Sequence, residues 1–173
     1  MANWYMLTLV GEDRHGIVAQ VTRALFEGGC HLGEASMMRL GGNFTIMLMV
    51  RTKLDTDNVE QLVQPVASQL GLRAHIDRIH GHLHQHRIPN VHVTVFGADR
   101  AGIIAQITGV LADAGLDILN LESDVGGSES QPIYIMQLEG LTGQPIEALQ
   151  AAIASAGLKD IDVRVTPIDT VMG

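Results

Sequence analysis

Two segments of the chain carry residue types that can bind a small zwitterion. Residues 11–22 read GEDRHGIVAQVT and residues 97–108 read GADRAGIIAQIT. The second segment begins 86 positions after the first, and eight of the twelve residues are identical. Each segment places Asp-Arg-x-Gly before an apolar run, which is typical of a tight turn that leads into a helix.

The start of such a helix can hold a carboxylate. Its first backbone N–H groups have no partner within the helix and carry partial positive charge. Gly16 and Gly102 have no side chain, so a ligand can approach the backbone closely there. Asp13 and Asp99 stand just before the turn and could hold the ammonium group of the same ligand.

Each of these residues also has a purely structural interpretation. The aspartates are good helix N-caps, and the glycines could simply allow a helix to pack tightly on a strand. Ile17 and Ile103 follow the turn in the two segments. We expect their side chains mainly in the core, although their N–H groups can still serve a ligand.

The same order of elements is expected around both segments. Alternating or β-branched residues predict strands at 4–10 and 90–96. Apolar residues at helical spacing predict helices that end at Gly29 and Gly115. The other expected elements are strands 31–40, 43–51 and about 72–80 with helix 56–70, and strands 117–125, 132–139 and about 160–168 with helix 144–156.

Each half therefore reads β-α-β-β-α-β. This order predicts the α+β class, with two ferredoxin-like domains in tandem, each an antiparallel sheet with helices on one face. The expected boundaries are 1–80 for the first domain, 81–89 for a linker and 90–173 for the second domain. Because the other face of each sheet needs cover, we expect the halves to pack together, the chain to form a homodimer, or both.

Composition excludes several classes of function. The chain has 173 residues and a formal net charge of -8, with no run of Lys or Arg, so direct nucleic-acid binding is not expected. No apolar run reaches the roughly 20 residues that span a bilayer, and the N-terminus does not resemble a signal peptide. Cys30 is the single cysteine, which fits a cytoplasmic location.

The expected linker, GHLHQHRIP, is rich in histidine. Histidines at every second position of an extended chain share a face and could bind zinc or nickel. A solvated linker without metal explains the same residues, and no cysteine or carboxylate cluster accompanies them. No metal or cofactor is therefore assigned.

Two copies of Asp-Arg-x-Gly-Ile-(Val/Ile)-Ala-x-(Val/Ile)-Thr occur in register. Each is followed about 13 residues later by Gly-(Cys/Leu)-(His/Asp)-(Leu/Ile). These motifs resemble ACT domains, small regulatory modules that bind amino acids, and the resemblance covers nearly the whole chain. Within that family, GGCHLGEASMMRLGGNFTIMLMV is similar to the tandem proteins of the glycine cleavage system transcriptional repressor group.

The resemblance implies a cleft between the Asp-Arg-x-Gly loop and the start of the second strand, commonly across a domain–domain interface. The family often has asparagine at the start of that strand and proline after Asp-Arg. Here His31 and Asp117 replace the asparagine, and His15 and Ala101 replace the proline. His31 could also be a structural strand-end residue and Asp117 a solvated turn residue. The implied ligand-binding positions are Asp13, Gly16, Ile17 and His31, and Asp99, Gly102, Ile103 and Asp117.

These observations predict a sensor that performs no chemistry. By resemblance, a small amino acid, with glycine or serine as first candidates, would bind at domain interfaces and act through contacts with a transcription activator protein. An enzyme is not expected, because the chain lacks GxSxG, GxxxxGK[ST] and HExxH motifs. The alternative is a ligand-free scaffold for dimerisation and protein interaction.

Overall fold

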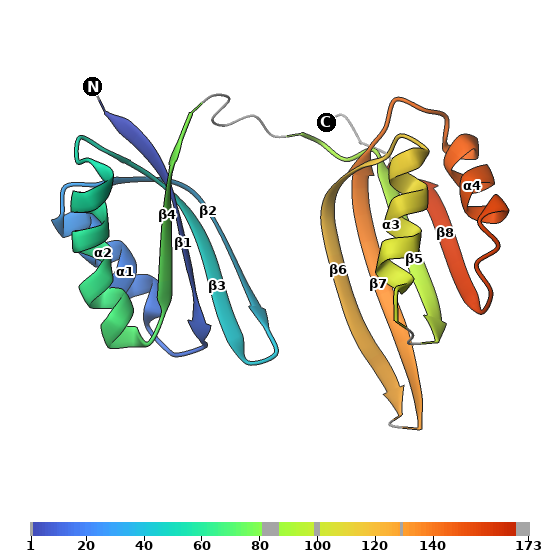
Figure 1. Ribbon diagram of the computed structural model, residues 1–173, viewed down its shortest axis with the longest axis horizontal. Helices are drawn as coiled ribbons and strands as arrows, with labels where there is room; N and C mark the ends of the chain where they lie inside the picture. Colours follow the sequence, from blue (N-terminus) through green and yellow to red (C-terminus); the bar gives the residue numbers. More distant parts are fainter. Residues whose placement is uncertain (1, 81–86, 99–100, 129, 169–173) are drawn as a thin grey trace. The chain divides into compact units, whose positions relative to one another are not determined.

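The computed structural model describes residues 2–80, 87–98, 101–128 and 130–168. The chain divides into two compact units, Met1–Gln85 and His86–Gly173. Each unit is a complete βαββαβ domain (Figure 1), and the two are described separately.

The first unit is an antiparallel sheet in the order β2-β3-β1-β4. The order follows from the connections: α1 carries the chain from β1 to β2 and leaves room between them for β3. The elements are β1 (Asn3–Glu12), α1 (Ile17–Glu27), β2 (His31–Leu40), β3 (Asn43–Thr52), α2 (Thr56–Leu70) and β4 (Arg73–Ile79).

The second unit repeats this topology, with the sheet order β6-β7-β5-β8. Its elements are β5 (Val91–Ala98), α3 (Ile103–Asp113), β6 (Asp117–Ser128), β7 (Gln131–Leu141), α4 (Ile146–Ser155) and β8 (Ile161–Pro167). The α+β class and the ferredoxin-like plan are thus confirmed. The strands expected at 117–125 and 132–139 extend into the polar segment between them, because β6 and β7 pair as far as Ser128 and Gln131.

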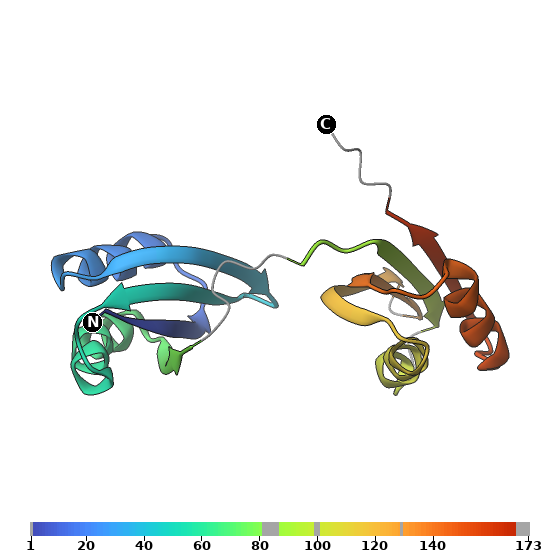
Figure 2. The same cartoon turned by 90° about the horizontal axis from the view of Figure 1, so that it is seen from above.

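Each core lies between one face of the sheet and the two helices that cover it (Figure 2). In the first unit Leu7 and Leu9 are buried on β1, facing Val21 and Leu25 on α1. Full burial of such a side chain stabilises the fold by about 1.5–3 kcal/mol. The alternating apolar residues of the strand and the apolar stripe of the helix therefore determine which face of each element is buried.

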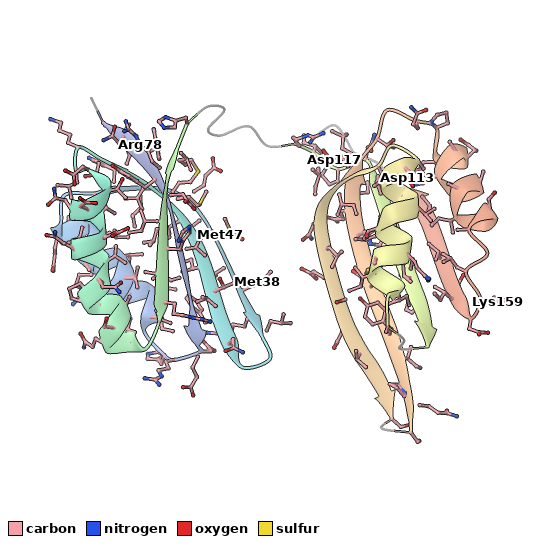
Figure 3. All side chains as sticks on the ribbon, viewed as in Figure 1. Met38, Met47, Arg78, Asp113, Asp117 and Lys159 are labelled. Atoms are coloured by element: carbon pink, nitrogen blue, oxygen red, sulfur yellow. The ribbon has the colours of Figure 1, made fainter. Side chains whose placement is uncertain are left out.

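The edge strand β2 is the exception to this burial. All ten of its residues are exposed, and it pairs with β3 alone. Met38 on β2 and Met47 on β3 are 55% and 47% exposed (Figure 3), whereas the neighbouring Met49 is buried. The first unit thus presents a long strand edge with apolar side chains beside it.

No helix among the described residues is long and apolar enough to cross a membrane.

Candidate functional site

The turn between β1 and α1 leaves the positive end of the helix open. Gly16 is the residue before the helix, with φ 85°, a left-handed conformation that residues with a Cβ avoid. Its carbonyl accepts a hydrogen bond from the backbone N–H of Gln20 at 3.1 Å. No side chain of the N-cap residue bonds the first turn, and that turn contains no acidic residue. Its N–H groups therefore keep their partial positive charge.

The second unit reproduces this geometry. Gly102 precedes α3 with φ 83°, and its carbonyl accepts from Gln106 at 3.0 Å. Among the described residues, again no side chain caps this helix and its first turn contains no acid. Ile103 and its counterpart Ile17 have buried side chains, so at these two positions only the backbone can serve a ligand.

Asp13 is held in place by the β2–β3 hairpin rather than used as a helix cap. Its backbone N–H donates to the carbonyl of Gly42 at 3.0 Å. Its Oδ2 lies 2.9 Å from Nε of Arg39. Its Oδ1 is buried and has no hydrogen-bond partner. A fixed carboxylate with one unused oxygen is suited to accept a hydrogen bond from an ammonium group.

Arg14 and His15 are exposed residues of the same loop. The guanidinium of Arg14 lies 3.0 Å from Oε2 of Glu12, and both side chains are largely exposed. His15 is exposed as well. The loop therefore offers one oriented acid, Asp13, and one helix end as its two binding groups.

His31 does not lie beside this loop within its own domain. It pairs with Arg51, which also pairs with Trp4 at the beginning of β1. Asp13 follows the far end of that strand. The eight residue-to-residue steps from Trp4 to Glu12 span about 27 Å in a strand. One domain alone therefore does not bring His31 together with Asp13, Gly16 and Ile17.

In the second unit Asp117 begins β6 and forms an ion pair with Arg87. Asp99, the counterpart of Asp13, lies outside the described residues. Gly102 and Ile103 stand at the start of α3 and Asp117 follows its end, so these predicted site residues are also separated by a helix of about 16 Å.

Two arginines with site contacts were missed by sequence reasoning. Arg39 orients Asp13, and Arg87 pairs with Asp117. Neither belongs to the repeated segments, and no spacing rule marks either one.

The first glycine of each repeated segment, in contrast, could have been identified from the sequence, because it occurs in both segments. A Cβ on Gly11 would lie 2.9 Å from the carbonyl oxygen of Gly71, and one on Gly97 would lie 2.9 Å from that of Asp160.

The grooves on the surface lie elsewhere. One of about 520 Å³ runs between α2 and β4 and includes Asp57, Glu60 and His75. Another of about 790 Å³ lies between α4 and β8. Two more border α3 and α4. None of these four contains a predicted site residue.

Among the described residues, no three His, Cys, Asp or Glu side chains gather as metal ligands. The linker histidines His82, His84 and His86 lie outside the described residues. His75 makes a contact of 3.0 Å with Asp77 on the same strand.

Comparison with solved structures supports the fold over the whole chain. A protein of unknown role from Galdieria sulphuraria superposes with a TM-score of 0.76 at 19% identity, covering 97% of this chain and 99% of that one. A protein named as a candidate glycine cleavage system transcriptional repressor gives a TM-score of 0.69 at 21% identity, covering 97% and 98%.

Sequence comparison agrees with the structural likeness. The glycine cleavage system transcriptional repressor of Escherichia coli (strain K12) is 23% identical over 155 residues, which are 89% of this chain and 82% of the repressor. Residues 5–77 match one model of the ACT domain, and residues 91–154 match a second. The chain therefore belongs to the ACT domain family, with two such domains in tandem.

Proposed function

We propose that this chain is an amino-acid-sensing regulator in which a small amino acid binds at interfaces between ACT domains. The observation that carries the proposal is the loop before α1. It combines an uncapped helix start with the oriented carboxylate of Asp13, whose buried Oδ1 has no partner. A helix start binds a carboxylate, and Asp13 complements an ammonium group. The two ends of an α-amino acid match these two groups.

The second wall of this site would come from a second copy of the chain. The edge of β2 is unpaired, long and flanked by exposed apolar side chains, and such an edge readily pairs with another strand. Antiparallel pairing of β2 with its copy places the start of one strand beside the end of the other. It would bring His31 of the second copy towards the hairpin that holds Asp13. Hence we propose a homodimer.

We further propose that ligand binding changes the contacts of this dimer with a transcription activator protein in the cytoplasm. The repressor relative from Escherichia coli supports a role in gene regulation. The acidic net charge of -8 favours action through protein contacts over direct binding to nucleic acid. Glycine and serine are the first ligands to test. We propose no catalytic activity.

A panel of amino acids in a thermal unfolding assay tests the sensor. A ligand at a hundred times its dissociation constant stabilises the folded state by about 2.7 kcal/mol, and each kcal/mol raises the melting temperature of a small domain by about 4–8 °C. An increase of several degrees with glycine or serine supports the proposal. No response to any amino acid, in a dimer of intact fold, contradicts it.

A ligand-free scaffold is the second candidate, favoured by the exposed β2 edge itself. The variant Asp13→Ala separates the two functions. A scaffold keeps its partner binding and shows no amino-acid effect with or without Asp13, whereas the sensor loses its amino-acid effect in the variant.

A further inference from the structure

One predicted ligand-binding residue already has a cationic partner from its own chain. The guanidinium Nη1 of Arg87 contacts Oδ2 of Asp117. Arg87 lies in the segment that leads into β5, and Asp117 is the first residue of β6. Their side chains are 55% and 52% exposed, so a small solute can reach either group from solvent. Figure 3 shows Asp117 at the end of β6 that the segment before β5 also reaches.

The segment that carries Arg87 is anchored three residues later, at Asn90. The side chain of Asn90 donates to the carbonyl of Thr142 at 2.8 Å and accepts from its N–H at 3.0 Å. The backbone N–H of Asn90 donates to Gly140 at 2.9 Å. Because β7 pairs Leu141 with Asp117, these bonds hold the segment beside the start of β6.

A further bond ties this anchor to the other side of Asp117. The hydroxyl of Thr142 donates to the carbonyl of Gly115 at 3.0 Å, and Gly115 lies two residues before Asp117. The acid and the segment that carries its partner are thus fastened to the same buried threonine. The ion pair joins two anchored parts of one domain and is not a contact between two free side chains.

We infer that Arg87 competes with the ligand for the second amino-acid site. This inference rests on the proposed function. The guanidinium of Arg87 occupies Oδ2 of Asp117. An ammonium group that uses Oδ2 must displace Arg87, and one that uses the other oxygen meets a carboxylate whose charge is already paired. Displacement releases the side chain of Arg87, while the segment that carries it stays anchored at Asn90.

The first domain differs at the corresponding place. His31 stands where the second domain has Asp117, and no ion pair to His31 occurs among the described residues. Arg39 contacts Asp13, but at Oδ2, and Oδ1 stays without a hydrogen-bond partner. The two sites should accordingly differ in affinity, with the site of Asp13 and His31 filled first.

Calorimetric titration of the full-length protein tests the competition. The first site is silenced by Asp13→Ala, and glycine and serine are titrated into this background with and without Arg87→Gln. An exposed ion pair changes an equilibrium by roughly 1.5- to 5-fold, so Arg87→Gln should tighten the second site by about two- to fivefold. Arg164→Gln is the matched control, because Arg164 is an exposed arginine of the same domain that lies 3.1 Å from Asp162.

The outcomes separate the alternatives. Weaker binding in Arg87→Gln would mean that Arg87 binds the carboxylate of the amino acid. An affinity equal to that of Arg164→Gln would mean that Arg87 has no role in binding. Either result would overturn the proposed competition. If no variant, including the protein with an intact Asp13, binds an amino acid, the proposed function fails together with the inference.

A measurement without ligand tests the ion pair itself. NMR relaxation of the Nε–H group should show that the side chain of Arg87 is less mobile in the wild type than in Asp117→Asn. Glu122→Gln removes an exposed acid from the same strand and should leave Arg87 unchanged. Equal mobility of Arg87 in all three proteins would show that the pair does not persist in solution, and the inference would be wrong.

Discussion

Replacing Asp13 with alanine is expected to leave the first domain as stable as the wild type, or more stable. The substitution removes the ion pair with Arg39, whose side chain is 65% exposed, and exposed pairs contribute about 0.2–1 kcal/mol. It also removes a buried carboxylate oxygen that has no partner, and an unsatisfied buried group costs about 1–3 kcal/mol. The net effect should lie between no change and about 3 kcal/mol of stabilisation.

The matched control is Asp55→Ala in the same domain. Asp55 caps α2, with Oδ1 accepting from the backbone N–H of Asn58 at 2.9 Å. Loss of such a cap costs about 1 kcal/mol. Substitution by alanine should therefore lower the stability of the domain at Asp55 but not at Asp13, because the Asp55 carboxylate caps a helix whereas Asp13 has a buried oxygen without a hydrogen-bond partner.

Urea unfolding followed by tryptophan fluorescence measures both variants. Trp4 is the chain's one tryptophan and lies in β1, so its signal follows the first domain alone. A loss of more than 1 kcal/mol in Asp13→Ala would mean that the aspartate serves the fold, and the interpretation of its free oxygen as a ligand group would be refuted.

Three further changes test the fold and the dimer. Gly97→Ala should destabilise the second domain by about 1–3 kcal/mol in thermal unfolding, because the new Cβ would lie 2.9 Å from the backbone oxygen of Asp160. Its control, Gly126→Ala, should be nearly neutral, because that Cβ has no neighbour nearer than 3.9 Å, and equal effects of the two substitutions would contradict this explanation. Leu111→Ala should cost about 2–5 kcal/mol, since Leu111 is completely buried, and a loss below 1 kcal/mol would place it outside the core. Met38→Lys should weaken self-association in analytical ultracentrifugation while the fold is retained, because lysine on an exposed edge opposes strand pairing. Phe26→Lys, at a position 76% exposed on α1, is the control, and unchanged association in Met38→Lys would argue against the β2 interface.

The repeat made the architecture predictable from sequence. Alternation in WYMLTLV and the helical stripe of Ile17, Val21 and Leu25 are local patterns that burial enforces, and the structure buries those three residues. The helix expected at 56–70 forms as well, with Asp55 as its cap. Such features depend on residues that are close in sequence, and local sequence patterns therefore predict them.

The contacts that define the site depend on residues far apart in sequence. Asp13 meets Arg39 across the hairpin, and Asp117 meets a residue 30 positions earlier. Neither contact follows from periodicity. The separation of His31 from Asp13 could have been foreseen, since a helix of about 16 Å lies between them. That span is also the physical reason why a site using both residues requires two domains.

Backbone amide chemical shifts of the full-length protein, recorded with saturating glycine and serine, test whether the start of α1 binds the carboxylate of an amino acid beside Asp13. If it does, the largest shifts fall on the N–H groups of Ile17 and Val18, and they vanish in Asp13→Ala. Shifts centred on the groove between α2 and β4, around Asp57 and His75, or the absence of any shift would contradict it.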